Sequence, residues 1–422
     1  MHDRGSTRAL ASLATIALAC ACSSDPPATP ADAGPEDAGV DGAIPCEGTG
    51  VSKGPWVVGA QSTVAKIRFE SCRAGIPGDI TIEPEAGGTP LTVKSIETPT
   101  VVTVTYIAPL NTSATPDYAG TWYMHEAALT GLTEGTCYRY ALAADATAKG
   151  RFCTAKKPGD DFRFLAIGDT NPGLGDTTSK LLEKLVPQAF DFTLHLGDIE
   201  YYDSTLETWA YWAPKMAPLL RQGAFFPAIG NHEFEKPTEY AEYVLRYFGA
   251  AGLNGSDGTY RFSNAGVHFF VLDTEEPTGP TSTQATWFAS EIVKAEQEPG
   301  YRFSIVYFHK PLVTCGDTGD DPVARQFFEP LFIAHKVPLV LQAHMHGYER
   351  FDFGNITYVT SGGGGGRIDD VDKNITRAYC NKRVASGPIF HGTIIDVKTG
   401  KLEGKAIDQD GVERDTYSLT VP

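Results

Sequence analysis

Polar side chains that can bind metal stand at the ends of several apolar runs in this sequence. The run "LQAHMH" ends in His344 and His346, "FRFLAIGD" ends in Asp169, and "DFTLHLGD" ends in Asp198. Residues two apart in an extended segment leave the same face, so the two histidines can lie close together. Taken alone, the pair is also compatible with an alternating surface strand. Carboxylates and imidazoles together are donors that hydrolytic metal centres use.

Two more apolar runs and one tyrosine extend this set. "AFFPAIGNHE" presents Asn231 and His232, "FSIVYFH" ends in His309, and "GDIEY" ends in Tyr201. So many run ends of one kind argue against coincidence. They predict a site for a pair of cations, with one carboxylate able to bridge and open positions for water and substrate. For Tyr201 the alternative is a buried aromatic side chain without a metal.

The elements that must position these residues change in type along the chain. Residues 46–156 consist of short β-rich runs with turn signals between them and predict an all-β sandwich. "KKPGDD" is the predicted boundary. Residues 161–422 alternate apolar strands with helical segments, which predicts an α/β unit whose strands feed one ligand-bearing edge. The helical segments are expected over 177–190, 238–249 and 282–297, and a closing hairpin around Thr399 and Gly400.

The N-terminus has the features of an export signal. Residues 1–22 have a basic start and an apolar stretch too short to span a bilayer as a stable anchor. Cys20 and Cys22 follow small residues, as at a bacterial lipoprotein processing site, so one of them is the candidate for lipid attachment. Ordinary secretory cleavage is the alternative. Residues 23–45 are rich in Pro, Ala, Gly and Asp and predict a disordered tether. We therefore expect an exported protein, either a cell-envelope lipoprotein or a secreted one.

Six further cysteines fit an exported protein, where disulfides persist. Cys137 and Cys153 lie on consecutive strand-like runs joined by a short polar turn, which favours a cross-strand bridge. The remaining pairs, Cys46 with Cys72 and Cys315 with Cys380, then follow by elimination.

The charge of the chain limits its partners. Against 35 Lys and Arg there are 52 Asp and Glu, a formal net charge of −17, which excludes a basic nucleic-acid footprint. An anionic substrate therefore needs local positive charge, which bound cations supply. No membrane contact is expected beyond the lipid, and no pattern defines the oligomeric state.

The order G-D, G-D-x-x-Y, G-N-H-E, a His after an apolar strand and H-x-H-x-Y-E-R resembles the calcineurin-like metallophosphoesterases. Tyr201 narrows the resemblance to the purple acid phosphatases, and it covers roughly residues 55–421. It implies a fibronectin type III-like sandwich followed by an α/β domain of four-layer αββα architecture. It also implies an acid phosphatase-like hydrolase that cleaves phosphate monoesters with a metal-bound hydroxide as nucleophile.

The resemblance assigns ligands residue by residue. One metal would bind Asp169, Asp198, Tyr201 and His346. The other would bind Asp198, Asn231, His309 and His344, with Asp198 bridging. Ferric iron is implied at the tyrosine site, and ferrous iron, zinc or manganese at the second site. His232 would contact the phosphate and protonate the leaving oxygen, with Glu233 as a possible orienting partner and Arg350 bracing the site through a carboxylate.

Two alternative functions are also considered, one because the sequence departs from the family pattern and one because a metal site can be residual. Residues 310–334 contain no histidine, whereas many plant members carry further substrate-facing histidines there. A phosphodiesterase of the same superfamily is therefore one alternative, because a diester leaves only one phosphate charge to hold. A surface binding module with a residual metal site is the other, and it would predict lost ligands. "SGGGGG" (361–366) is expected to be a structural turn, and His195 a core histidine.

Overall fold

The computed structural model describes residues 46, 48–102, 120–171, 175–199, 201, 206–234, 244, 246–249 and 258–422. The predicted export signal with Cys20 and Cys22, the predicted tether and most of the helix expected over 238–249 lie outside these residues. Within the described part of the chain, no helix is long and apolar enough to span a membrane.

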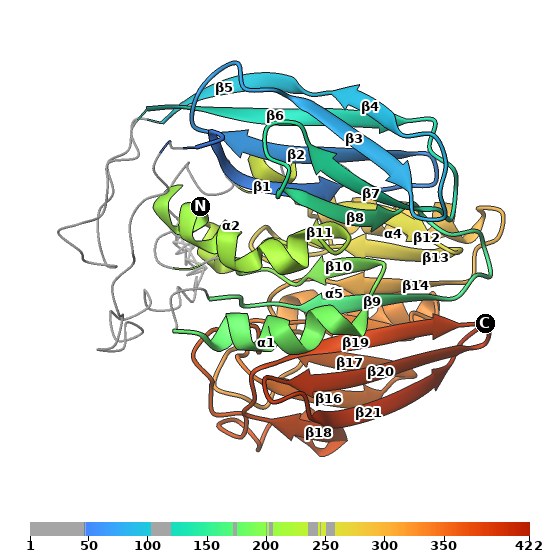
Figure 1. The fold of residues 1–422 in the computed structure, drawn as a ribbon. Coiled ribbons are helices and arrows are strands. Elements are labelled where there is room, and N and C mark those ends of the chain that lie inside the picture. Colours follow the sequence, from blue (N-terminus) through green and yellow to red (C-terminus); the bar gives the residue numbers. More distant parts are fainter. Residues whose placement is uncertain are drawn as a thin grey trace, which may run out of the picture. The chain divides into compact units, whose positions relative to one another are not determined.

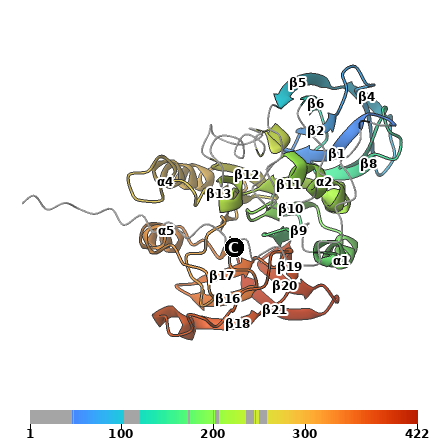
Figure 2. The ribbon, with the colours of Figure 1, turned by 90° about the vertical axis from the view of Figure 1, so that its left-hand side faces the viewer.

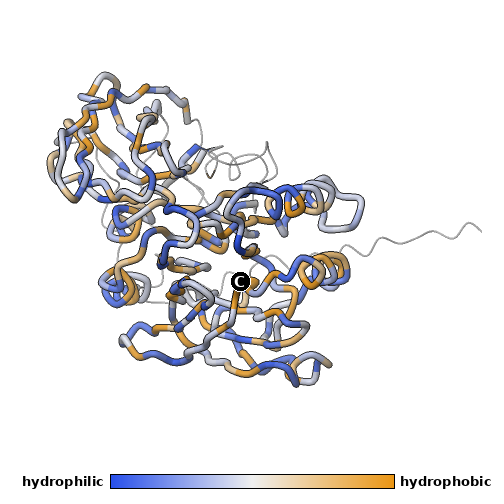
Figure 3. Tube along the Cα trace, turned by 90° about the vertical axis from the view of Figure 1, so that its right-hand side faces the viewer, coloured by the Kyte–Doolittle hydropathy of each residue, from blue (hydrophilic) through white to orange (hydrophobic). Residues whose placement is uncertain are grey.

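The N-terminal region is all β, as predicted. One four-strand group contains β1 (Val51–Val58), β2 (Val64–Ser71), β6 (Gly120–Thr130) and β5 (Ile96–Val102). The opposing sheet contains β4 (Leu91–Lys94), β3 (Asp79–Pro84), β7 (Cys137–Leu142) and β8 (Lys149–Cys153). Buried residues such as Ile67, Phe69, Ile82 and Tyr138 share one core. Buried and more exposed residues alternate along β3 and β7, which is the period expected when one face of a sheet is buried. Figure 3 shows hydrophobic and hydrophilic residues interspersed along the chain.

The C-terminal region contains two central sheets. The first sheet runs β21 (Glu413–Thr420), β20 (Lys401–Asp408), β19 (His391–Lys398), β9 (Phe162–Ile167), β10 (Phe192–His195) and β11 (Ala224–Pro227). The second runs β12 (Tyr260–Asn264), β13 (Val267–Val271), β14 (Phe303–Tyr307), β15 (Leu339–Gln342), β17 (Ile356–Ser361), β16 (Tyr348–Phe353) and β18 (Arg383–Gly387). Strands β9 to β11 are mutually parallel, and so are β13, β14, β15 and β17. The predicted hairpin is present, because Lys398 of β19 faces Lys401 of β20 across residues 399 and 400.

Helices cover the outer faces of these sheets. They are α1 (Thr177–Leu185), α2 (Leu206–Leu220), α4 (Thr283–Glu296) and α5 (Pro322–Ala334), with short 3-10 helices η2 (Val186–Gln188), η3 (Asn231–Phe234) and η4 (Ala378–Lys382). One core holds α1 and α2 against the first sheet, and another holds α4 and α5 against the second. Figures 1 and 2 show these two helix layers on opposite sides of the sheets. The predicted four-layer αββα arrangement is confirmed.

Aromatic side chains fill the space between the two sheets. Phe164 and Phe192 of the first sheet meet Phe269 of the second edge to face, with ring centroids 5.4 Å and 5.5 Å apart. All three are buried, and burying a side chain of this size contributes about 1.5–3 kcal/mol. This core holds the strand ends of both sheets in fixed relation.

Local sequence sets the ends of the helices. The predicted helix over 177–190 ends at Leu185, since Pro187 in the following η2 has no N–H to continue the pattern. Asp321 caps α5 by accepting from the backbone of Val323 and Ala324, and Pro322 occupies the first turn. Neither α2 nor α5 was predicted from the sequence.

Three disulfides join the predicted pairs in the described residues: Cys46–Cys72, Cys137–Cys153 and Cys315–Cys380. Cys137 and Cys153 face each other across β7 and β8, as the strand pattern predicted. The pairing of all six cysteines is confirmed.

Strand β1 connects the two regions. Val57 of β1 pairs in parallel register with Ala224 of β11, so the sandwich strands β1, β2, β6 and β5 extend the first central sheet. Residues 156–161, which the sequence predicted as the boundary, lie in the turn between β8 and β9. Hydrogen bonding in the sheet therefore crosses from one region to the other.

Candidate metal centre

The predicted ligands lie just beyond the carboxyl ends of strands from both central sheets. They follow β9, β10, β11, β14 and β15 in that order: Asp169, Asp198, Asn231, His309, and His344 with His346. Parallel strands deliver such loops to one edge of a sheet. Tyr201 joins them from the loop after β10. The structure thus brings together all seven residues that were predicted to bind metal.

Asp198, Asn231, His309 and His344 form a cluster that we call the histidine side. His309 Nε2 lies 3.1 Å from Asn231 Oδ1, 3.1 Å from His344 Nδ1 and 3.1 Å from Asp198 Oδ2. The ring is fully buried, and its Nδ1 lies 2.9 Å from the carbonyl oxygen of Leu196. A carbonyl only accepts, so Nδ1 carries a proton and the ring presents Nε2 to the cluster.

Asp169, Asp198, Tyr201 and His346 form the tyrosine side. The Tyr201 hydroxyl lies 2.9 Å from His346 Nε2 and 3.2 Å from Asp169 Oδ1. His346 Nε2 is also 3.3 Å from Asp169 Oδ1. Its Nδ1 donates to the carbonyl oxygen of Arg367 at 2.7 Å, so this ring has the same orientation toward its cluster as His309 has.

Asp198 is common to both sides. Ligand atoms of Asp198, His309 and His344 all lie within 4.8 Å of one another, and so do those of Asp169, Asp198 and His346. The carboxylate is buried, and its Oδ2 lies 3.1 Å from His309 Nε2. One carboxylate therefore faces two groups of donors.

The charge of the cluster favours cations. Burial opposes a charge on either ring, yet Asp198 raises the pKa of His309 to about 10, and Asp169 raises the pKa of His346 to about 9. Burial and then repulsion from His309 hold the pKa of His344 well below its ordinary value. Burial, with Asp169 and Asp198, raises the pKa of Tyr201 well above 10. The two carboxylates thus favour a proton on each of two imidazole rings. Bound cations would replace those protons.

These donors fit a pair of hard cations. Carboxylate and amide oxygens, imidazole nitrogens and a phenol oxygen lie close together, and the buried Asp198 Oδ2 lies 3.1 Å from His309 Nε2. Such a donor set suits divalent and trivalent metals in hydrolytic sites.

Comparison with known proteins supports this view of the site. The family model for calcineurin-like phosphoesterases matches residues 162–348, which span all seven predicted ligands. The chain is 28% identical over 261 residues to a phosphoenolpyruvate phosphatase of Allium cepa, covering 57% of this chain and 53% of that protein. It is 27% identical over 281 residues to purple acid phosphatase 1 of Ipomoea batatas, covering 61% and 55%.

A solved structure shares the fold. A purple acid phosphatase from yellow lupin (Lupinus luteus) seeds superposes with a TM-score of 0.69 at 16% sequence identity, over 87% of this chain and 74% of that one. Residues 162–348 form a calcineurin-like metallophosphoesterase domain that is related to the purple acid phosphatases. Its N-terminal β region is consistent with a fibronectin type III-like domain. The matched segments span little more than half of the two curated relatives.

Metallophosphoesterases bind two metal ions, and in this one three candidate ligands have strained backbones. Asp169, Asp198 and His344 have φ angles of 59°, 49° and 67°, a left-handed region that costs a residue other than glycine about 1–2 kcal/mol. Hydrogen bonds hold these conformations, since the N–H of His344 donates to Asp169 Oδ2 at 3.0 Å and that of Asp169 to Gly197 O at 3.1 Å. The strain lies at the residues that would carry the chemistry.

The glycines before the ligands of this metallophosphoesterase have a packing role. A Cβ on Gly197 would lie 2.7 Å from the His309 ring, and one on Gly230 would lie 2.2 Å from Asp198 Oδ1. Real Cβ atoms do not come so near. The G-D and G-N pairs therefore keep the ligand loops close together.

The glycine run 362–366 packs against the loops that carry Asp169 and His346. The N–H of Gly366 donates to the carbonyl oxygen of Asp169 at 2.9 Å, and a Cβ there would lie 2.7 Å from the His346 ring. A Cβ on Gly362 would lie 2.4 Å from the carbonyl oxygen of Met345. The run therefore packs main chain against both ligand loops, as expected of a structural turn.

Glu233 supports the loop that carries Asp198. Its carboxylate accepts from the N–H groups of Asp198, Ile199 and Gly230 at 3.0, 2.8 and 2.7 Å. Burial, and then repulsion from Asp198, raises the pKa of Glu233 to about 8. The sequence suggested that Glu233 orients His232. These bonds show instead that Glu233 holds the backbone of the Asp198 loop.

His232 lies beside Asp198 and Tyr201 and is half-buried. Its N–H donates to Asp198 Oδ1 at 2.9 Å, its Nε2 lies 3.8 Å from Asp198 Oδ2, and its ring centroid is 4.0 Å from that of Tyr201. The ring thus stands beside the carboxylate that both clusters share.

Arg350 binds carboxylates outside the ligand cluster. It donates to Asp415 Oδ2 and to Asp352 Oδ2, each at 2.7 Å. These residues belong to β21 and β16, so Arg350 connects strands of the two central sheets, whereas the sequence suggested that it braces the metal site.

One supporting residue was missed in the sequence. Asp369 accepts from the N–H of His346 at 2.9 Å and from the hydroxyl of Thr318 at 3.2 Å. It lies in "RIDD", directly after the glycine run, but an acidic residue in a loop has no distinguishing pattern. Only the folded chain shows that it faces His346.

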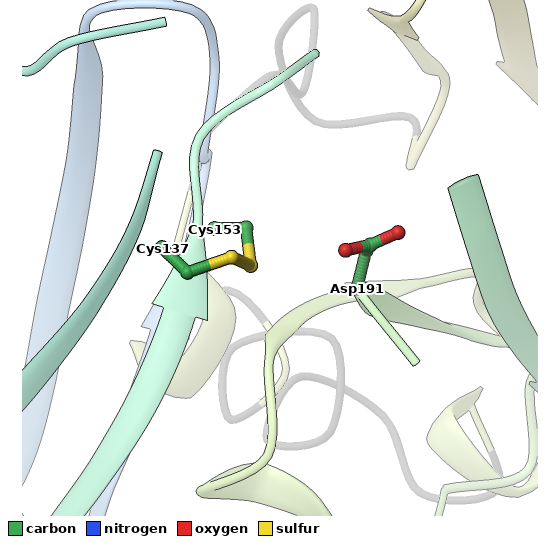
Figure 4. A group of neighbouring side chains, drawn as sticks. All are labelled: Cys137, Cys153 and Asp191. Atoms are coloured by element: carbon green, nitrogen blue, oxygen red, sulfur yellow. A yellow bond between two sulfur atoms is a disulfide. The ribbon is translucent and has the colours of Figure 1, made fainter. Parts of the chain in front are cut away.

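Two other groups have structural roles. His195 is buried, lies 2.9 Å from the Thr170 hydroxyl through Nε2, and burial lowers its pKa to about 3. Figure 4 shows Asp191 near Cys137 and Cys153, whose sulfurs form a disulfide. Asp191 instead accepts from Lys156 Nζ at 2.8 Å. Neither group is a metal site.

Proposed function

We propose that this protein hydrolyses phosphate monoesters at a binuclear metal centre of the purple acid phosphatase type. The observation that carries this proposal is Asp198, whose one carboxylate lies within 4.8 Å of ligand atoms from two donor groups. A shared carboxylate is what a pair of closely spaced metals requires. The retention of all seven donors also argues against a binding module with a residual site.

The two sides divide the ligands between the two metals. Asp169, Asp198, Tyr201 and His346 would hold one ion, and Asp198, Asn231, His309 and His344 the other. The cations would acidify a water molecule and neutralise charge on the phosphate. We propose ferric iron on the tyrosine side and ferrous iron, zinc or manganese on the histidine side.

His232 is the proposed proton donor to the leaving oxygen. It is a half-buried imidazole whose Nε2 lies 3.8 Å from Asp198 Oδ2, and the bond from its backbone N–H to Asp198 Oδ1 fixes its backbone. The ring packs on Tyr201, which limits its rotation. A positioned imidazole of this kind contributes about 10²–10⁴-fold to rate as a general acid.

The experiment that tests the centre is a visible absorption spectrum with metal analysis of wild type and Tyr201→Phe. A ferric phenolate absorbs visible light, so we expect a band in the wild type, about two metals per chain, and loss of the band in the variant. A colourless protein with two metals would contradict the ferric site. A wild type that binds no metal would overturn the proposal.

A phosphodiesterase remains the second candidate, because residues 310–334 contain no histidine that would add positive charge near the substrate. Turnover of p-nitrophenyl phosphate and bis(p-nitrophenyl) phosphate by the same preparation separates the two. We expect the monoester to have the larger kcat/KM.

We also propose that the protein is exported and lipid-anchored. Three disulfides and the relation to purple acid phosphatases suggest an extracellular protein. Cys22 or Cys20 would carry the lipid, residues 23–45 would form the tether, and domains would span 46–156 and 161–422. Labelling of Cys20→Ser and Cys22→Ser variants with a radioactive fatty acid tests the anchor, since one substitution should abolish incorporation.

A further inference from the structure

An ion pair lies at the same sheet edge as the metal ligands. Lys310 directly follows His309 at the end of β14, and Glu275 follows the neighbouring strand β13. These strands are parallel, with Val271 opposite Tyr307. Lys310 Nζ lies 2.8 Å from Glu275 Oε2. The pair therefore belongs to the edge where the histidine side is built.

The segment that carries Glu275 is firmly held. Gln284 of α4 accepts from the N–H of Asp273 at 3.1 Å and donates to the carbonyl oxygens of Asp273 and Pro277 at 2.6 Å and 3.0 Å. The hydroxyl of Thr274 accepts from the N–H of Lys310 at 2.9 Å. These bonds fix the backbone on both sides of the ion pair.

The pair is asymmetric in exposure. The Glu275 side chain is 8% exposed, and that of Lys310 is 27% exposed. Among the described residues, Glu275 Oε1 accepts no hydrogen bond. The carboxylate is thus buried, while the lysine side chain is partly exposed to solvent. Burying a carboxylate costs several kcal/mol unless other interactions offset it. The buried Glu275 carboxylate therefore holds the Lys310 ammonium in place at a cost in stability.

We propose that Lys310 is a specificity-determining residue that binds a non-bridging oxygen of a dianionic phosphate on the histidine side, with Glu275 as its positioning residue. The inference rests on the proposed function and names its substrate class, a phosphate monoester. A monoester dianion has one more charged oxygen than a diester, and a fixed ammonium discriminates between the two. Lys310 would thus supply positive charge in a stretch without histidines.

The competing explanation is that the two residues only neutralise each other and stabilise the loop. In that case loss of Lys310 would change stability but would not distinguish a dianion from a monoanion. A measurement on ligands that differ in one charge therefore separates the two explanations.

The test is calorimetric binding of inorganic phosphate and of dimethyl phosphate to the metal-loaded full chain, at a pH where phosphate is mostly dianionic. The variants are Lys310→Gln, which removes the charge, and Lys310→Arg, which retains it. Lys294→Gln is the matched control, since Lys294 pairs with Glu291 at 2.6 Å on the exposed face of α4. Metal content is measured before each titration.

We expect Lys310→Gln to weaken phosphate binding roughly tenfold or more, the range of one hydrogen bond to a charged group. Dimethyl phosphate should weaken by much less, Lys310→Arg should recover most of the affinity, and Lys294→Gln should bind like wild type. Equal weakening of both ligands, or phosphate affinity within about twofold of wild type, overturns the inference. A wild type that binds phosphate but hydrolyses no ester would overturn the proposed function alone.

Discussion

The two sides of the metal centre are built from different parts of the chain. On the histidine side, His309 is fully buried and is held by Leu196, a residue just beyond strand β10 of the first central sheet. On the tyrosine side, the His346 side chain is 16% exposed and is held by the carbonyl oxygen of Arg367 and by Asp369, from the loop after the glycine run. One side is supported by strand ends, and the other by a loop.

Because of this difference, the two sides can be altered separately. Strand ends are fixed by the aromatic core between the sheets, so the histidine side keeps its geometry without a metal. The tyrosine side depends on a loop whose support can be altered without disturbing the sheets. Substitutions can therefore weaken one side alone, and only Asp198 should abolish both.

The largest effect is expected for Asp198→Asn. Removal of the shared charge should empty both sides and reduce activity by more than the roughly 10–100-fold typical of residues that only support a ligand. Metal analysis and kcat/KM are the measurements. Asp191→Asn is the control, because Asp191 pairs with Lys156 away from the centre. Two tightly bound metals in Asp198→Asn would contradict the shared role.

Asp369→Asn should weaken the tyrosine side alone. The variant loses the charge that holds the His346 backbone, and we expect metal affinity there to fall about 10–100-fold. Dialysis against graded chelator, followed by metal analysis and the visible spectrum, measures this. Asp372→Asn serves as control, since that exposed residue pairs with Arg383. Equal loss of both metals would show that the two sides are not independent.

The effect of pH should differ between metal-free and metal-loaded protein. Without metal, the pKa values of His309 and His346 are raised to about 10 and about 9. Raised pKa values contribute stability that is fully present below the unfolded value near 6.5 and is lost as pH rises through 9 to 10. Metals displace these protons, so the loaded protein should not show this loss.

Denaturant unfolding at pH 7.5 and 9.5, with and without metal, provides the measurement. We expect the stabilisation by metal to grow by ~2 kcal/mol or more between these pH values. A stabilisation that shrinks as pH rises would show that protons and metals do not compete for the two rings.

The smallest effect is expected for Arg350→Ala. The substitution removes bonds to Asp415 and Asp352 and should lower the free energy of unfolding by ~1 kcal/mol. Metal content and kcat should not change, because those carboxylates lie on β21 and β16. A loss of metal from this variant would instead connect Arg350 to the centre.

The sequence predicted the parts of the molecule that follow from local pattern. Alternating runs predicted the sandwich strands, and apolar runs that end in polar residues predicted the convergence of seven donors. The Cys137–Cys153 bridge followed from two adjacent strands. Each of these depends on neighbours within a few residues, where periodicity and turn chemistry act.

Long-range geometry was not predictable in the same way. No pattern marks Asp169, Asp198 and His344 as left-handed residues, because their conformations depend on bonds from distant loops. Asp369 approaches His346 only because the glycine run returns the chain to the site. Helix α2 was missed because Pro214 and Pro218 lie within it and obscure a helical pattern.

The single parallel pair between Val57 of β1 and Ala224 of β11 has a consequence for dissection of the protein. A protein that began at residue 161 would leave β11 with a bare edge of unpaired N–H and C=O groups, and such edges recruit other chains. The bond from Arg221 Nη2 to the carbonyl oxygen of Gly54 would be lost as well. The sandwich therefore protects this sheet edge, and a fragment without it should aggregate.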